Sequence, residues 1–192
     1  MAYNFKNVRT ISLTAVLIAL TIIGNRLLII PVGQVLEIRF GFVFLSVIAF
    51  LFGPIVAFAA GFLTNMLGFL LFPTGGGFNP LFDLNIGLSG ILYAIFLYKR
   101  NHKSEYFIIW IVAAKASVNL ICNIIINTRL LILFGFIPGN SKNIITTVRV
   151  FKNFTLLPVE IIIIFFILKF VANYAYKYNF IKPAKNNKSI KI

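Results

Sequence analysis

Between Phe151 and Tyr174 the chain reads FKNFTLLPVEIIIIFFILKFVANY, a run dominated by isoleucine, phenylalanine and leucine. An α-helix rises about 1.5 Å per residue, so roughly 20 apolar residues cross the hydrocarbon of a bilayer. This run is long enough for one crossing, and similar runs recur along the chain. Of the 192 residues 60% are hydrophobic, which leaves too little polar surface to cover a water-soluble globule. The sequence therefore predicts a helical domain buried in a membrane and excludes a soluble enzyme.

Six apolar runs, separated by charged residues or by glycine and proline, are candidate transmembrane helices. They lie at residues 11–30, 40–52, 55–72, 82–98, 107–129 and 151–174. The basic residues before the first run resemble a secretory signal, but no small-residue cleavage site precedes Pro31, so we expect the run to be retained. Gly53-Pro54 should turn the short second run sharply into the third. Residues 1–178 are thus expected to form a single all-α domain, the six-transmembrane-helix bundle of a polytopic membrane protein.

The positions of lysine and arginine predict which ends of the helices face the cytoplasm. Cytoplasmic connections carry an excess of these residues close to the helix ends. They gather before the first run, around Lys99, Arg100 and Lys103, and in the tail at 179–192. Six helices put both ends of the chain on one side, so we expect both termini to be cytoplasmic. The basic tail lacks apolar periodicity, which favours contact with anionic membrane lipid over nucleic-acid binding.

Several cations are left for the outer side, because 18 lysine and arginine residues face only 4 acidic ones and the net charge is +14. We interpret Arg39 and Lys142 as loop cations that reach lipid headgroups. Arg26 still has four apolar residues of the first run after it, and Arg149 and Lys152 stand one helical turn apart at the start of the sixth. Cations placed toward hydrocarbon normally face a bundle interior, a partner or water. These three predict an outward-facing cavity for an anion.

The fifth run carries a polar stripe, because Lys115, Asn119, Asn123 and Asn127 recur every four residues. Such amides either hold helices together or line a wet pocket. We assign Asn119 to helix contact and Asn127 to the cavity, and Asn123 fits either role. Lys115 and Glu160 reach a similar depth near the middle of the bilayer, so we expect them to form an ion pair of mainly structural importance.

The connection after the third run combines glycines, aromatic rings and hydrogen-bonding side chains. Glycines permit close backbone approach to a ligand, while the other residues offer flat rings and polar edges. The candidate substrate contacts are Phe72, Gly76, Phe78, Asn79, Phe82, Asp83 and Asn85. The Asp83 carboxylate can accept two parallel N–H bonds from an aminopyrimidine edge. It can equally be an N-cap or first-turn residue of the fourth helix.

Catalytic chemistry and metal binding have no support in the sequence. Cys122 is the single cysteine and lies in an apolar run, and His102 is the single histidine. We expect His102 to be a solvated loop residue. No Ser/His/Asp set, paired carboxylates or His-rich cluster is present, so we expect no catalytic residue, cofactor or metal.

Several stretches, in this order, resemble the substrate-binding S component of energy-coupling factor (ECF) vitamin transporters, specifically the folate family. They are Ala15-x-x-x-Ala19 with Arg26 after it, residues 61–75 ending in Phe72-Pro73-Thr74-Gly75, Phe82-Asp83-Leu84, residues 88–93, residues 127–135, and Arg149-x-x-Lys152-Asn153 followed by Leu157-Pro158. The likeness covers the whole span region. At residues 78–84 the chain departs from the Phe-Pro-Gly-Phe-Thr-Leu usual in that family.

The resemblance implies a receptor in a bacterial plasma membrane that captures a folate-like anion. It implies a pterin at Asp83 and Asn85, an aromatic linker along the phenylalanines, and a glutamate tail at Arg26, Arg149 and Lys152. It also implies partners: one membrane coupling protein, contacted by Ala15 and Ala19, and two cytoplasmic ATPases. ATP would be hydrolysed there, since this chain has no G-x-x-x-x-G-K-[ST] motif.

Three other functions compete with folate capture. An S component for another vitamin, such as pantothenate or a thiamine-related compound, would share the mechanics and differ in the pocket. A membrane enzyme acting on lipid lacks the residues for chemistry. A channel needs charge rings along a through-pore, whereas the cations here gather at one end.

Overall fold

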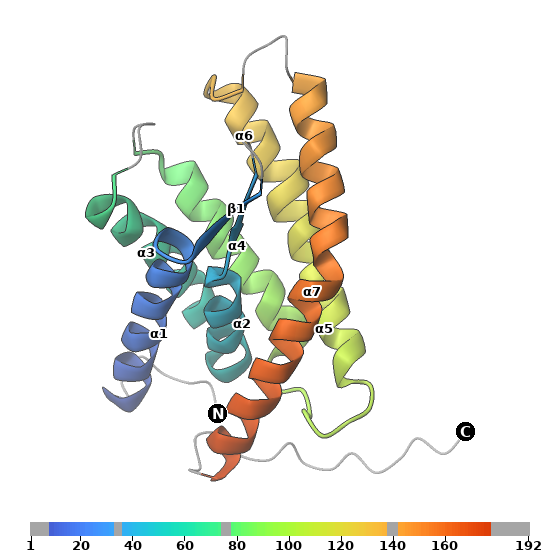
Figure 1. The fold of residues 1–192 in the computed structure, drawn as a ribbon. Helices are drawn as coiled ribbons and strands as arrows, with labels where there is room; N and C mark the ends of the chain where they lie inside the picture. Colours follow the sequence, from blue (N-terminus) through green and yellow to red (C-terminus); the bar gives the residue numbers. More distant parts are fainter. Residues whose placement is uncertain (1–7, 33–35, 74–77, 138–141, 178–192) are drawn as a thin grey trace.

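The structure is a computed structural model that describes residues 8–32, 36–73, 78–137 and 142–177 (Figure 1). Its elements, in chain order, are α1 (Val8–Arg26), β1 (Ile29–Val32), β2 (Leu36–Arg39), α2 (Gly41–Phe52), α3 (Pro54–Leu71), α4 (Pro80–Leu97), α5 (Phe107–Ser117), the π-helix η1 (Val118–Ile126), α6 (Asn127–Leu133) and α7 (Lys142–Lys177). The expected tail and Gly76 lie outside the described residues.

Four helical stretches are long and apolar enough to cross a membrane. They are α3, α4, the continuous helix Phe107–Leu133 and, within α7, Asn143–Ala175. The apolar parts of α1 and α2 are shorter, over Thr10–Arg26 and Gly41–Phe52. Many large apolar side chains, such as Phe166 and Phe170, are exposed on the outside of the bundle. These features describe a helical membrane protein.

The first helix ends earlier than the sequence predicted. It stops at Arg26, and Leu27–Ile30 do not continue it; instead β1 pairs with β2 in an antiparallel hairpin, with Ile29 opposite Arg39 and Val32 opposite Leu36. Pro31 cannot donate the next helical hydrogen bond, and the β-branched residues beside it favour a strand. Arg26 therefore lies at a helix end and not inside an apolar span.

The break between α2 and α3 lies at Gly53-Pro54, as the sequence indicated. Gly53 has φ 86°, a left-handed conformation that favours glycine, and Pro54 occupies the first turn of α3. On α3 the small residues Ala57 and Gly61 let α4 approach closely, because a Cβ added at Gly61 would lie 2.6 Å from the carbonyl oxygen of Ile86. This small-residue pair serves internal packing.

The fifth predicted run forms one continuous helix with a π-helical middle. The π-helix η1 covers Val118–Ile126 between α5 and α6. A π-helix widens the turn and leaves main-chain carbonyls available to side chains. Two carbonyls of this segment are used in this way: Asn85 Nδ2 donates to Cys122 O at 3.2 Å, and Thr128 Oγ1 donates to Asn123 O at 3.4 Å.

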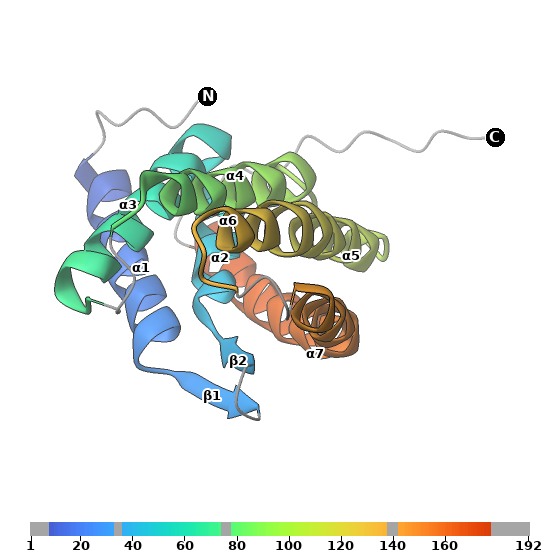
Figure 2. The same ribbon diagram turned by 90° about the horizontal axis from the view of Figure 1, so that it is seen from above.

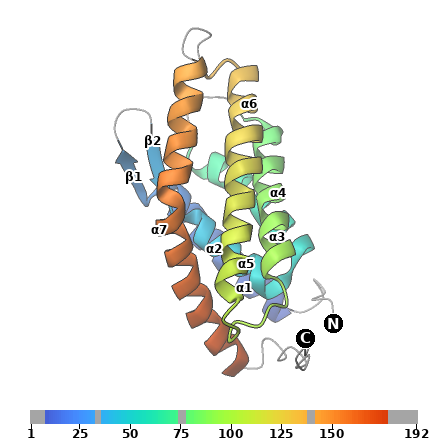
Figure 3. The same ribbon diagram turned by 90° about the vertical axis from the view of Figure 1, so that its right-hand side faces the viewer.

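The last helix, α7, begins nine residues before the predicted start at Phe151, at Lys142. Arg149 and Lys152 consequently lie inside a helix and not at its start. Pro158 sits within α7, and Figure 3 shows the helix changing direction along its length. Proline removes one helical hydrogen bond and clashes with the preceding turn, which accounts for the bend.

The helices place two distinct ends on the bundle. Figure 1 shows the start of α1, the end of α7 and the α4–α5 connection at one end, and the hairpin and α6 toward the other. Seen from above in Figure 2, the other helices surround α2. This agrees with burial, since nearly every residue of α2 from Val43 to Phe52 is buried.

Candidate functional site

A cavity of about 720 Å³ lies at the hairpin end of the bundle. Its walls come from the end of α1, strand β2, the start of α2, the second half of α3, the segment from Phe78 to Tyr93 that includes most of α4, the fifth helix and α7. These segments lie toward the end of the bundle that is opposite the start of α1 (Figure 1). The volume falls within the range of small-molecule sites.

Most of the predicted substrate residues line this cavity. They are Arg26, Phe78, Asn79, Phe82, Asp83, Asn85, Asn127, Arg149 and Lys152. Residues from four separate helices and from the segment just before α4 are thereby brought together, although the chain separates Arg26 from Lys152 by most of its length. Their role in binding stays a prediction.

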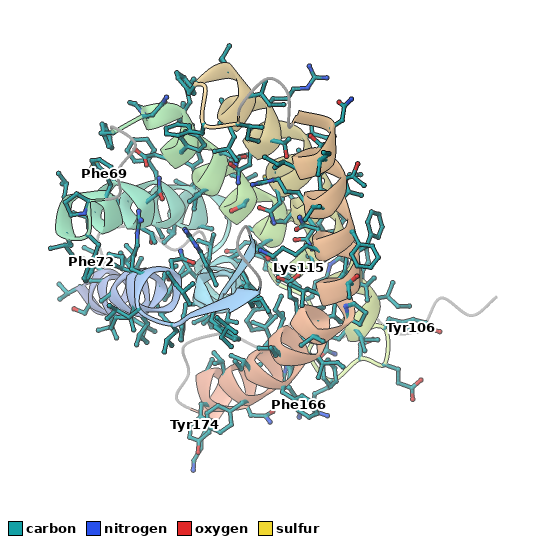
Figure 4. All side chains as sticks on the ribbon, turned by 45° about the horizontal axis from the view of Figure 1, so that its top comes forward. Phe69, Phe72, Tyr106, Lys115, Phe166 and Tyr174 are labelled. Carbon is teal, nitrogen blue, oxygen red and sulfur yellow. The ribbon has the colours of Figure 1, made fainter. Side chains whose placement is uncertain are left out.

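Phe72 is an exception among the predicted contacts. It is the C-cap residue of α3, its side chain is 39% exposed, and it is absent from the cavity wall. Phe69, one turn earlier, lines the cavity instead, and its ring centroid lies 5.6 Å from that of Phe78. Figure 4 shows Phe69 and Phe72 at the far end of α3, away from Lys115 at the centre of the bundle.

The charge of the cavity wall is positive. Its described side chains include five basic residues, Arg26, Arg39, Lys115, Arg149 and Lys152, and two acidic residues, Asp83 and Glu160. Subtracting two from five leaves a net charge of +3. Arg39 was interpreted as a loop cation at lipid headgroups, and that interpretation is wrong because β2 carries it to the rim of the cavity. The side chain of Lys142 lies outside the described residues.

The floor of the cavity is a closed polar cluster, formed by Lys115, Asn119, Asn123 and Glu160. Lys115 Nζ lies 3.1 Å from Glu160 Oε1, which confirms the predicted ion pair. Asn119 Nδ2 donates to Glu160 Oε2 at 3.1 Å and to the carbonyl oxygen of Asn153 at 3.3 Å. Asn119 therefore joins the fifth helix to α7, as expected. Asn123 Nδ2 donates to Asn119 Oδ1 at 3.0 Å, and Asn123 also lines the cavity.

Asp83 is fully buried at the wall of the cavity. Its Oδ1 accepts a hydrogen bond of 2.5 Å from Asn65 Nδ2. The N-cap of α4 is Asn79, whose side chain accepts from the backbone N–H of Leu81, so Asp83 is a first-turn residue and not the cap. Its second oxygen, Oδ2, has no hydrogen-bond partner within the described ranges.

Arg149 and Arg26 reach the cavity from opposite sides. Arg149 Nη2 donates to the carbonyl oxygen of Asn123 at 3.4 Å, in the π-helical segment. The Arg26 side chain lies along α3, where a Cβ added at Gly68 would be 3.3 Å from Arg26 Nε. Two guanidinium groups on facing walls can hold the carboxylates of one ligand.

Several buried polar atoms of the wall lack a partner in the part of the chain that the structure describes. They are Thr64 Oγ1, Asp83 Oδ2, Asn85 Oδ1, Tyr93 Oη and Arg149 Nε. A buried polar group without a partner costs free energy, so such groups usually have one when the protein works. Their gathering around one cavity is the arrangement expected of a ligand site.

Sequence reasoning missed part of the wall. Thr21, Asn25, Thr64, Asn65 and Phe136 all line the cavity. The signal for Asn65 was available, since it is an amide within the apolar third run. Phe136 gave no such signal, because phenylalanine occurs 22 times in this chain. Its ring lies 6.1 Å from that of Phe82.

His102 does not behave as the sequence suggested. Its side chain is 6% exposed and Nε2 lies 3.1 Å from Asn173 Oδ1 on α7. The expected solvated loop residue is thus buried between the α4–α5 connection and the last helix. Over the described ranges, no group of three or more His, Cys, Asp and Glu side chains could hold a metal ion.

Three comparisons place this chain among known proteins. The model of the family described as "ECF-type riboflavin transporter, S component" matches residues 5–175. The folate transporter FolT of Clostridium novyi (strain NT) is 26% identical over 160 residues, which are 83% of this chain and 88% of that protein. A crystal structure of FolT bound with folic acid is 27% identical and has a TM-score of 0.69, covering 92% of this chain and 96% of that one.

Proposed function

This chain belongs to the family of ECF-type riboflavin transporter S components, and from that premise we propose that it captures folate or a related pterin vitamin for import. Members of the family are transporter subunits and not enzymes. The similar protein from Clostridium novyi is named a folate transporter, and the similar crystal structure holds folic acid. These two relatives favour folate over the vitamin in the family's name.

A single observation carries the proposal: within the described residues, the cavity wall combines a buried cationic donor, Arg149 Nε, with two buried acceptors, Asp83 Oδ2 and Asn85 Oδ1, and none of the three has a hydrogen-bond partner there. Folate has the matching halves, a glutamate with two carboxylates and a pterin whose pyrimidine edge carries N–H donors. Riboflavin bears no carboxylate, so it would leave the net charge of +3 without a counter-charge. Pantothenate bears one carboxylate but has no flat ring system for the phenylalanines.

The glutamate half belongs with Arg26, Arg149 and Lys152. A guanidinium binds a carboxylate through two parallel N–H bonds, and burial strengthens the interaction because water competes less. Arg149 Nε is buried and has no partner among the described residues, so a ligand carboxylate would satisfy it. Asn127 lies one turn beyond Asn123 on the same wall and supplies an amide.

The pterin half belongs with Asp83 and Asn85. Asn65 holds one oxygen of Asp83 and leaves Oδ2 to accept from the ligand, while Asn85 Oδ1 offers a second acceptor. The rings of Phe78 and Phe82 line the same part of the cavity and can stack on a flat heterocycle. Asn79 caps α4 and so fixes the position of this wall.

The proposed topology is six membrane-crossing helices in one domain, with both termini in the cytoplasm. The start of α1 and the end of α7 lie at the same end of the bundle (Figure 1). That end also carries Lys99, Arg100 and Lys103, which the positive-inside rule assigns to the cytoplasm. The cavity then opens outward from a bacterial plasma membrane. A reporter that is active only in the cytoplasm, fused after Ile192, should be active.

Transport requires partners that supply the energy. We propose a membrane coupling protein and two cytoplasmic ATPases, in line with the family. Ala15 and Ala19 support a docking role for α1, because both side chains are exposed on one face of the helix. The equivalent small residues of α3, Ala57 and Gly61, are buried against α4 and are not available to a partner.

Competition binding tests the function directly. The full chain, purified without partners, is incubated with labelled folic acid and a large excess of unlabelled folic acid, riboflavin or pantothenate. Folic acid should displace the label, and the other two vitamins should leave it bound. Displacement by riboflavin at the same concentration as folic acid, or no retention of folic acid at all, would contradict the proposal.

A further inference from the structure

A second cavity, of about 420 Å³, lies at the opposite end of the bundle. It is formed by the α4–α5 connection, the first turn of α5 and the last third of α7. Its lining residues are His102, Lys103, Ser104, Glu105, Ile108, Phe165, Lys169 and Asn173. The first cavity, at the hairpin end, is the proposed vitamin site and is called the vitamin cavity below; it shares none of these residues.

The polar side of this cavity is built to meet an anion. Lys103 and Lys169 reach it from two different elements, against one carboxylate on Glu105. His102 also lines the cavity, and its Nε2 lies 3.1 Å from Asn173 Oδ1. Burial lowers the pKa of the His102 imidazole, and Lys103 and Lys169 lower it further, although the hydrogen bond to Asn173 acts in the other direction. The two lysines therefore supply the positive charge.

Further cations surround the same end. Lys99 lies over the ring of Tyr98 at 5.1 Å, and Arg100 stacks on Trp110 at 3.5 Å from the ring centroid. The local potential is positive well beyond the cavity, which attracts anions from the surroundings.

The apolar side of the cavity continues onto the outer surface of the bundle. Ile108 lines the cavity and is 43% exposed, and Phe165 stacks edge to face on Phe166, which is 66% exposed. Phe170 and Tyr174 stack at 4.7 Å on the same stretch of α7. Figure 4 shows Tyr106, Phe166 and Tyr174 pointing outward around this end of the molecule. Exposed tyrosines such as Tyr106 and Tyr174 mark the boundary between hydrocarbon and headgroups.

We infer that this cavity binds the headgroup of an anionic phospholipid. The lysine ammonium groups of Lys103 and Lys169 would hold the phosphate, and Ser104 and Asn173 would donate to the glycerol oxygens. The acyl chains would lie along the exposed apolar residues of α5 and α7. A soluble anion would use the lysines alone and leave the adjoining apolar surface uncovered, which favours a lipid.

Native mass spectrometry of the full chain tests the site. The protein is released from micelles that contain equal amounts of phosphatidylglycerol and phosphatidylcholine, and the bound lipids are counted. Phosphatidylglycerol should be retained preferentially. The double variant Lys103→Gln/Lys169→Gln should lower the ratio of retained phosphatidylglycerol to phosphatidylcholine by about tenfold or more, since it removes two charged hydrogen-bond donors to the phosphate.

The matched control is Lys99→Gln/Lys177→Gln, which removes the same charge from the same end without touching the cavity lining. This variant should keep the preference for phosphatidylglycerol within about twofold, since both cavity lysines stay in place and the exposed charges outside the cavity are screened. An equal loss in both double variants would overturn the inference, because it would show a diffuse field and no site. Equal retention of the two lipids by the parent chain, or displacement of phosphatidylglycerol by inorganic phosphate, would overturn it as well.

Discussion

The floor and the wall of the vitamin cavity carry the same kinds of side chain in opposite states. At the floor, Lys115 and Glu160 form an ion pair, and Asn119 completes the hydrogen bonds of the carboxylate. At the wall, Asp83 Oδ2 and Arg149 Nε are buried without a partner among the residues described. The ion pair at the floor is closed, while the wall still offers hydrogen bonds to a ligand.

Whether a buried charge already has its partner separates structural from functional charges in a membrane protein. A buried charge that already has its partner contributes to folding, and removing that partner leaves an isolated charge in a medium of low polarity. A buried polar group without a partner destabilises the protein alone and gains from a ligand that supplies one. Mutations at the floor should therefore change folding, and mutations at the wall should change binding.

The largest effect is expected at the floor. Replacing Lys115→Met leaves Glu160, whose side chain is only 15% exposed, without its counter-charge, which should cost about 3–5 kcal/mol of folding free energy. Thermal unfolding of the purified protein in detergent, followed by size-exclusion chromatography, measures the loss. The double variant Lys115→Met/Glu160→Met removes both charges and should recover most of the stability. Failure of the double variant to recover would show that the pair is not the cause.

The next effect is expected at the cationic wall. Arg149→Ala should lower the affinity for folic acid about tenfold to a hundredfold, because a charged hydrogen-bond donor to a carboxylate is lost. The unfolding temperature of the ligand-free protein should stay the same or rise, since a desolvated guanidinium is removed. Isothermal titration with folic acid measures the first quantity. A large drop in stability with unchanged affinity for folic acid would show that Arg149 stabilises the fold and does not bind the vitamin.

Asp83 is the acidic residue of the wall whose Oδ2 is expected to bind the pterin. Asp83→Asn keeps the size of the side chain but replaces an acceptor with a donor, so we expect about a tenfold loss in folic acid affinity. Affinity for para-aminobenzoylglutamate, which has the glutamate half and no pterin, should be unaffected. Equal losses for the two ligands would place the pterin elsewhere.

The smallest effect is expected at Phe72, which defines the edge of the wall. Phe72→Ala should leave folic acid affinity within about twofold, whereas Phe69→Ala should lower it several-fold because Phe69 lines the cavity and contacts Phe78. The same titration reads both variants. A larger loss at Phe72 than at Phe69 would show that the connection after α3 closes over the ligand.

Periodicity and charge predicted much of the fold and of the site. Apolar runs of the right length indicated the helices, and Gly53-Pro54 indicated the break between α2 and α3. The depth of Lys115 and Glu160 along two helices predicted their pairing, because rise per residue fixes depth in a helix that crosses a membrane. Cations left over on one side predicted the cavity.

The sequence did not predict features that depend on proline, on strand pairing or on contacts between distant segments, because hydropathy does not record these effects. Residues 27–30 are as apolar as a span, yet Pro31 and the pairing with β2 turn them into a hairpin. Carbonyl oxygens of the π-helix at Val118–Ile126 accept hydrogen bonds from side chains on α4 and α7, and the hydropathy of the sequence does not encode such contacts between distant segments. His102 looked solvated because the burial by α7 is a tertiary contact.

A high-resolution structure of the chain with folic acid bound would test the division between floor and wall most directly. We predict that the glutamate carboxylates bind Arg26 and Arg149, that the pterin contacts Asp83, and that Lys115 stays paired with Glu160. A carboxylate of the vitamin bound to Lys115, with Glu160 displaced, would contradict this division.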